Sequence, residues 1–105
     1  MGKTKTIQEL STLLAIALRH RIGSLVNENE VYAQKYAKDA EVLFEQARKT
    51  ASRENWNMYD KNNIFKELKK KLGVELASRD FLNEKKFGIM DEQIDKVLKE
   101  LGLME

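Results

Sequence analysis

The feature that most constrains this sequence is the absence of proline from all 105 residues. Average usage gives about five prolines in a chain of this length, and proline breaks helices because it lacks a backbone donor. Apolar residues recur at helical spacing, and no alternating apolar–polar run is long enough to indicate a strand. The sequence therefore predicts an all-α fold whose helix ends are set by glycine and capping residues.

Two long helices are predicted in the first half of the chain. The first begins at Thr6, which forms a Thr-x-x-Glu capping box with Glu9. Gly23 either ends this helix or is passed through to about Val26. The second begins near Asn27 or Asn29 and extends to about residue 53. We expect the two helices to form a long antiparallel hairpin over residues 1–54.

Three short helices joined by glycine and serine turns are predicted over residues 60–104. Their expected caps and stops, in chain order, are Asp60 and Gly73, then Ser78 and Gly88, then Asp91 and Gly102. Neither half of the chain is large enough to build much of a core alone. We therefore expect one helical domain over residues 1–105, a hairpin followed by a three-helix subdomain, with about five helices in all.

Composition argues against several classes of function. The formal net charge is only +2, with no cysteine and one histidine, so neither a thiolate nor a histidine-rich metal site is expected. No constellation of residues suggests catalysis, and no cofactor motif is present, so we expect a non-enzyme without a cofactor or metal. The apolar run at residues 13–18 is too short for a signal peptide or a membrane span, which favours a cytoplasmic protein.

The leading hypothesis is a non-catalytic protein–protein interaction module or small subunit that self-associates. It rests on the length of the second helix and on its alanine-rich face, which either packs on the first helix or receives a partner. The distal alanines Ala47 and Ala51 and the linker aromatics Trp56 and Tyr59 are the expected contacts to another protein or a second copy.

The alternative hypothesis is a helix-turn-helix-like domain that binds nucleic acid through a basic face over residues 66–86. Its expected phosphate contacts are Lys66, Lys69, Lys70, Arg79, Lys85 and Lys86. Residues 59–105 carry equal numbers of basic and acidic side chains, so the same lysines also fit a solvated helix face.

Arg21 lies near the centre of the apolar face of the first helix. An unpaired buried guanidinium is costly, so this side chain must find a partner or reach solvent. A helix that ends at Gly23 would let Arg21 extend into solvent, whereas a continuous helix would place it in a buried pair or an anion contact.

Overall fold

The computed structural model describes residues 2–27, 29–78 and 85–104, and this part of the chain contains five helices and no strand. The helices are α1 (Gly2–Val26), α2 (Glu30–Ala51), α3 (Met58–Ala77), α4 (Lys85–Gly88) and α5 (Met90–Glu100). The all-α prediction is confirmed, and so is the long hairpin of α1 and α2.

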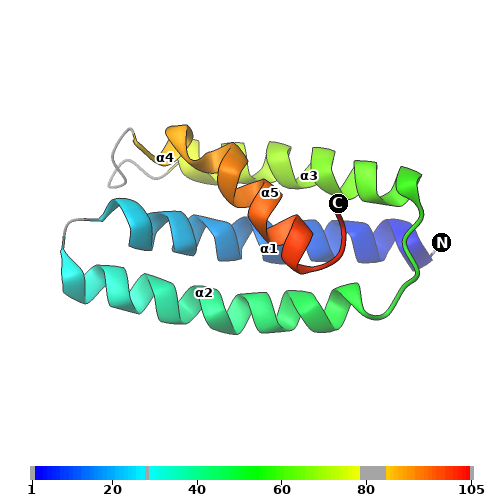
Figure 1. Ribbon diagram of the computed structural model, residues 1–105, viewed down its shortest axis with the longest axis horizontal. Coiled ribbons are helices and arrows are strands. Elements are labelled where there is room, and N and C mark those ends of the chain that lie inside the picture. The colour runs from blue at the N-terminus through cyan, green and yellow to red at the C-terminus, as the bar shows by residue number, and fades with distance from the viewer. Residues whose placement is uncertain (1, 28, 79–84, 105) are drawn as a thin grey trace.

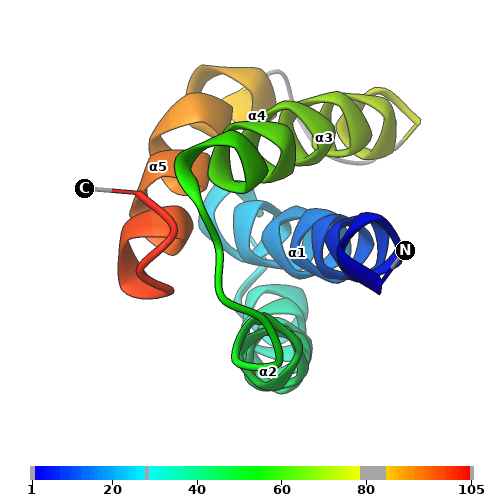
Figure 2. The ribbon, with the colours of Figure 1, turned by 90° about the vertical axis from the view of Figure 1, so that its right-hand side faces the viewer.

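The central element is α1, which lies between α2 and α3 (Figure 1). Viewed from the end of the molecule, α2 packs on one side of α1, while α3 and α5 cover another (Figure 2). Among the described helices α2 contacts α1 alone, whereas α3 also contacts α4 and α5. The molecule is therefore layered around α1, and α2 is an outer helix.

The core is built from two stripes of apolar residues at spacing i, i+4. One stripe follows α1 and the other follows α3, and both are completely buried; they comprise Leu10, Leu14, Leu18 and Ile22, and Ile64, Leu68, Leu72 and Leu76. Buried side chains of α2 and α5 join the same cluster. Both halves of the sequence thus contribute to one shared core, because α3 packs along the helix that begins the chain.

Two helix ends differ from the prediction because tertiary packing extends the helices. α1 begins at Gly2 rather than at Thr6, so Thr6 lies within the helix and does not cap it. α3 continues through Gly73 to Ala77 instead of ending there. An interior glycine costs about 1 kcal/mol relative to alanine, and burial of Leu72 and Leu76 on the same face outweighs that cost. The predicted short third helix is thus 20 residues long.

The caps of the C-terminal helices also differ from the prediction. Ser78 is the C-terminal cap of α3 rather than the start of the next helix, and the region from 79 to 84 lies outside the described residues. α5 begins at Met90 with Ile89 in the cap position and no side-chain cap, so Asp91 lies in its first turn. Gly23 does not end α1, and Asn29 caps α2, which settles both alternatives left open by the sequence.

One buried polar group contributes nothing to this core. The hydroxyl of Ser11 is completely buried in α1 and has no hydrogen-bond partner within the described residues. Ser11→Ala is expected to raise the free energy of unfolding by about 1 kcal/mol, because it removes an unsatisfied hydroxyl and introduces a better helix former. Urea denaturation measures the change. The exposed control Ser52→Ala should stay within about 0.5 kcal/mol of the parent, and a loss of stability in Ser11→Ala would contradict the assignment.

Candidate functional site

The start of α3 is fixed by a reciprocal capping box. The side chain of Asn57 accepts a hydrogen bond from the backbone N–H of Asp60 (2.8 Å), and the Asp60 carboxylate accepts one from the backbone N–H of Asn57 (3.2 Å). Asp60 was predicted to be the N-cap, whereas it occupies the third helical position and Asn57 is the N-cap. The predicted cap is therefore wrong, and the residue types alone do not distinguish the two positions, since both asparagine and aspartate cap helices well.

Lys3 ties this helix start to the first turn of α1. Its amine donates to the Asp60 carboxylate at 3.0 Å, across 57 residues of sequence. The hydrogen bond from Lys3, together with the backbone hydrogen bond at Asn57, holds the pKa of Asp60 below its ordinary value of 3.8. The beginnings of α1 and α3 are therefore joined by one carboxylate, which also sets where the following side chains of α3 lie.

Met58 and Tyr59 lie at this helix start and are largely exposed. Their exposed fractions are 80% and 73%, among the highest of the large hydrophobic residues in the described chain. Met58 also borders a hollow of about 600 Å³, which we name the methionine pocket; its lining residues are Met58, Lys61, Asn62, Phe65, Leu103 and Met104. An exposed pair of large apolar side chains beside an apolar hollow is typical of a contact surface.

The far wall of the methionine pocket is positioned by Gly102. This glycine has φ of 72°, the left-handed conformation that ends helices at low cost. The N–H of Leu103 bonds to the carbonyl of Leu98 (2.8 Å) and that of Gly102 to the carbonyl of Lys99 (3.1 Å), the pattern of a Schellman motif. Leu103 is thereby buried and Met104 reaches the pocket. The predicted stop at Gly102 is confirmed, whereas the pocket it helps to form was not predicted.

Trp56 packs against the core near the end of α2. Its indole N–H donates to the carbonyl of Ala51 at 2.9 Å, and its ring packs half-buried against the core. Trp56 thus covers the end of the core at the connection between α2 and α3. Of the two predicted linker aromatics, Tyr59 is the one whose side chain is free for a partner.

The predicted alanine contacts lie inside the molecule. Ala47 is completely buried and Ala51 is 9% exposed, both in the core cluster that α2 shares with α1. The expectation that they contact a partner is therefore corrected, because α1 already occupies that face of α2 along its second half. The first part of α2, residues 30–39, contains no buried residue.

The predicted basic face is divided by the fold. Lys66, Lys70 and Lys85 are exposed. Lys69 is exposed as well, but it pairs with Asp91 at 3.7 Å. Lys86 is only 6% exposed, with its amine 5.2 Å from the centre of the Phe87 ring, so its place on a solvated basic face is corrected.

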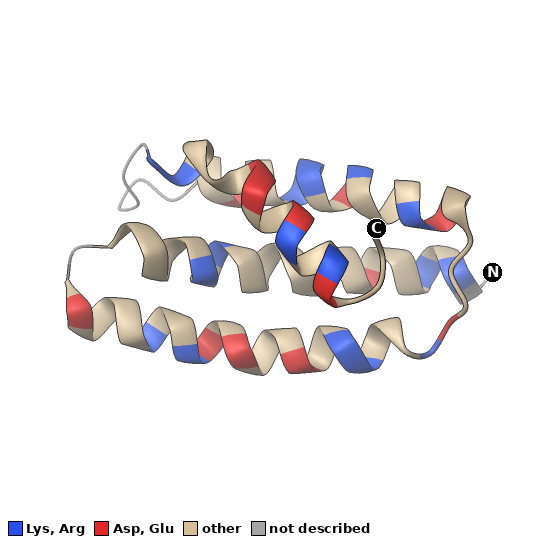
Figure 3. Cartoon of the chain, in the orientation of Figure 1, with Lys and Arg blue, Asp and Glu red and all other residues tan. Residues whose placement is uncertain are grey.

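Arg79, the remaining member of that set, lies outside the described residues. Acidic positions are interspersed among the basic ones on both α3 and α5 (Figure 3). The described lysines therefore do not form a continuous basic stripe.

No group of acidic or histidine side chains suited to holding a metal ion occurs in the described residues. Within the same residues, no helix is both long enough and apolar enough to cross a membrane. Comparison of the chain with protein-family models, with curated proteins and with solved structures found no match. The functional argument consequently rests on the surface itself.

The lowered pKa of Asp60 makes the free energy of unfolding depend on pH. Because its pKa is lowered in the folded state, its contribution is fully present above about pH 3.8 and is lost as the pH falls through the lower folded-state value. Between about pH 6 and pH 2, the parent should lose more free energy of unfolding than Asp60→Asn. Urea denaturation at several pH values in this range measures the free energy of unfolding of both proteins. The pH-dependent loss for Lys3→Met should lie between those of the parent and Asp60→Asn. Parallel curves for the parent and Asp60→Asn would contradict the role assigned to this carboxylate.

Proposed function

We propose that the protein is a non-catalytic helical subunit that self-associates through the methionine pocket. The observation that carries the proposal is the exposure of Met58 and Tyr59 beside a hollow lined by Phe65, Leu103 and Met104. Association would remove this apolar area from water, which is the dominant favourable term in most protein–protein contacts.

A second copy of the chain is the partner that this surface suits best. In a two-fold symmetric dimer the same patch of each subunit meets its copy, so the patch must be self-complementary. Here the projecting side chain of Met58 lies at the rim of a hollow large enough to receive a side chain of that size. Methionine suits such a contact because its flexible thioether adapts to irregular surfaces.

Other features of the molecule also favour an interaction role. α2 leaves most of its circumference uncovered, since it contacts only α1 among the described helices. Binding of nucleic acid through residues 66–86 stays a prediction, and the division of its lysines gives it no added support.

The test is the concentration dependence of the molecular mass, measured by analytical ultracentrifugation. We expect the parent chain to pass from monomer to dimer as its concentration rises. Met58→Glu should weaken the dimer at least about tenfold, equivalent to roughly 1.4 kcal/mol, because it places a charge in an apolar contact.

The matched control is Val31→Glu, which introduces the same charge at an equally exposed apolar position (74%) on α2. This variant should associate like the parent. A strict monomer at every concentration, or equal weakening by both substitutions, would refute the proposed surface.

A further inference from the structure

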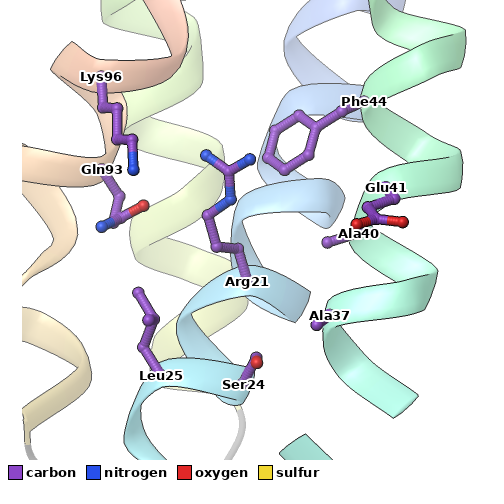
Figure 4. Close-up of a pocket in the computed structure, with 9 residues that line it drawn as sticks. All are labelled: Arg21, Ser24, Leu25, Ala37, Ala40, Glu41, Phe44, Gln93 and Lys96. Carbon is purple, nitrogen blue, oxygen red and sulfur yellow. The ribbon is translucent and has the colours of Figure 1, made fainter. Parts of the chain in front are cut away.

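A second pocket lies between α2 and α5, over the second half of α1 (Figure 4). It exists because α2 and α5 both pack on α1 but do not contact each other. Its volume is about 300 Å³. We name it the Arg21 pocket, and the residues that matter most in it are Arg21, Leu25, Ala40, Phe44, Gln93 and Lys96.

Arg21 enters this pocket from α1, and no ion pair holds it there among the described residues. Its guanidinium carbon lies 4.1 Å from the centre of the Phe44 ring, a cation–π contact that offsets part of the cost of burial. The Nη1 atom is buried without a hydrogen-bond partner, and no carboxylate of the described residues lies within ion-pair distance of Arg21. Arg21 is partly buried, and a buried guanidinium nitrogen whose donors are unused is costly unless an acceptor reaches it.

Two side chains of α5 face the same point. Gln93 is only 7% exposed, and its side-chain oxygen Oε1 is buried with no hydrogen-bond partner in the described part of the chain. Figure 4 shows this oxygen and the amine of Lys96 both directed toward Arg21, on the side opposite Phe44. Two cations that carry N–H donors and one hydrogen-bond acceptor thus converge, yet the Nη1 atom of Arg21 and the Oε1 atom of Gln93 each stay without a hydrogen-bond partner.

We propose that the Arg21 pocket binds an α-carboxylate with a neighbouring N–H group on a small apolar body. This is the chemistry of an apolar amino acid, either as a free molecule or as the C-terminal residue of a peptide. The guanidinium of Arg21 and the amine of Lys96 bind the carboxylate through charge-assisted hydrogen bonds. The Oε1 atom of Gln93 accepts the hydrogen bond from the ligand's N–H.

The remaining residues that line the pocket would contact the apolar body of the ligand. Leu25 is 58% exposed at the mouth, and Ala37, Ala40 and Phe44 add apolar surface from α2. Glu41, also on α2, gives the pocket a negative charge that opposes a doubly charged anion such as phosphate. The volume is at the lower end of the range for small-molecule sites, so it suits one residue rather than a longer segment.

The probe is N-acetyl-leucine, titrated into ¹⁵N-labelled protein and followed by the NMR signals of the Gln93 side-chain amide. Saturable shifts of these signals are expected. N-acetyl-leucine amide, which lacks the carboxylate, and 4-methylpentanoate, which lacks the N–H group, should each bind at least about tenfold more weakly. Inorganic phosphate should bind more weakly than N-acetyl-leucine.

Arg21→Met is the decisive variant because it keeps an unbranched apolar side chain against Phe44 while removing the uncompensated charge. Because Arg21 has no ion-pair partner among the described residues, its removal leaves no partner charge buried and unpaired, so the variant is expected to fold. It should weaken N-acetyl-leucine binding at least about tenfold. Lys96→Met should also weaken binding, whereas Lys99→Met, the same change at an exposed lysine of α5 outside the pocket, should not.

The two sources of the ligand are separated by comparison with leucine. Tighter binding of leucine, whose ammonium suits Glu41, would assign a free amino acid, whereas tighter binding of N-acetyl-leucine would assign a peptide C-terminus. Absence of saturable shifts, equal binding by Arg21→Met, or preference for phosphate or for the amide would overturn the proposal. None of these readouts depends on self-association through the methionine pocket.

Discussion

The structure depends on the burial of α1 by the helices around it. The leucine stripe of α1, continued by Ile22, is fully buried, and the other four helices of the described residues each contact α1. α2 has no other neighbour among the described helices, so its helix packing depends on α1. The Arg21 pocket arises from this layout, because α2 and α5 share one central neighbour and need not fill the space between one another.

The two sites lie in different parts of the molecule, and of the two only the Arg21 pocket is lined by residues of α1. Lys3 anchors the start of α3, where the methionine pocket lies, and Arg21 enters the other pocket 18 residues further along α1. At 1.5 Å per residue these positions are about 27 Å apart. Substitutions this far apart usually have additive effects on the free energy of unfolding. We therefore treat the two surfaces as energetically independent. Asp60 and Gly102 position one surface, while Phe44 and Gln93 shape the other.

The sequence predicted those features that depend on local pattern. The spacing of apolar residues such as Leu10, Leu14 and Leu18 predicted the first helix. Gly102 correctly predicted the end of α5, because a left-handed residue there needs no distant contact. Gly73 was likewise predicted to end its helix. Its helix continues because Leu76 is buried against other elements, and the sequence does not show that contact.

The candidate surfaces depended still more on tertiary structure. Tyr59 was predicted as a contact and is exposed, but its neighbour Met58 joins a pocket with Met104, which is 46 positions away in the sequence. Because Arg21 lies on the apolar face, the sequence indicated that its side chain needs either a partner or access to solvent. Of the two predicted alternatives for this helix, the structure has the one that continues through Gly23. Only the fold shows that Gln93 and Phe44 flank it.

Self-association through the methionine pocket is tested most directly by the methyl signals of the methionines, followed by ¹³C NMR as the protein is diluted. Met58 and Met104 line the pocket, and Met90, half-buried at the start of α5, serves as the internal reference. The signals of Met58 and Met104 should move with concentration while that of Met90 stays fixed. Signals that are independent of concentration, or a larger change at Met90, would contradict the proposed interface.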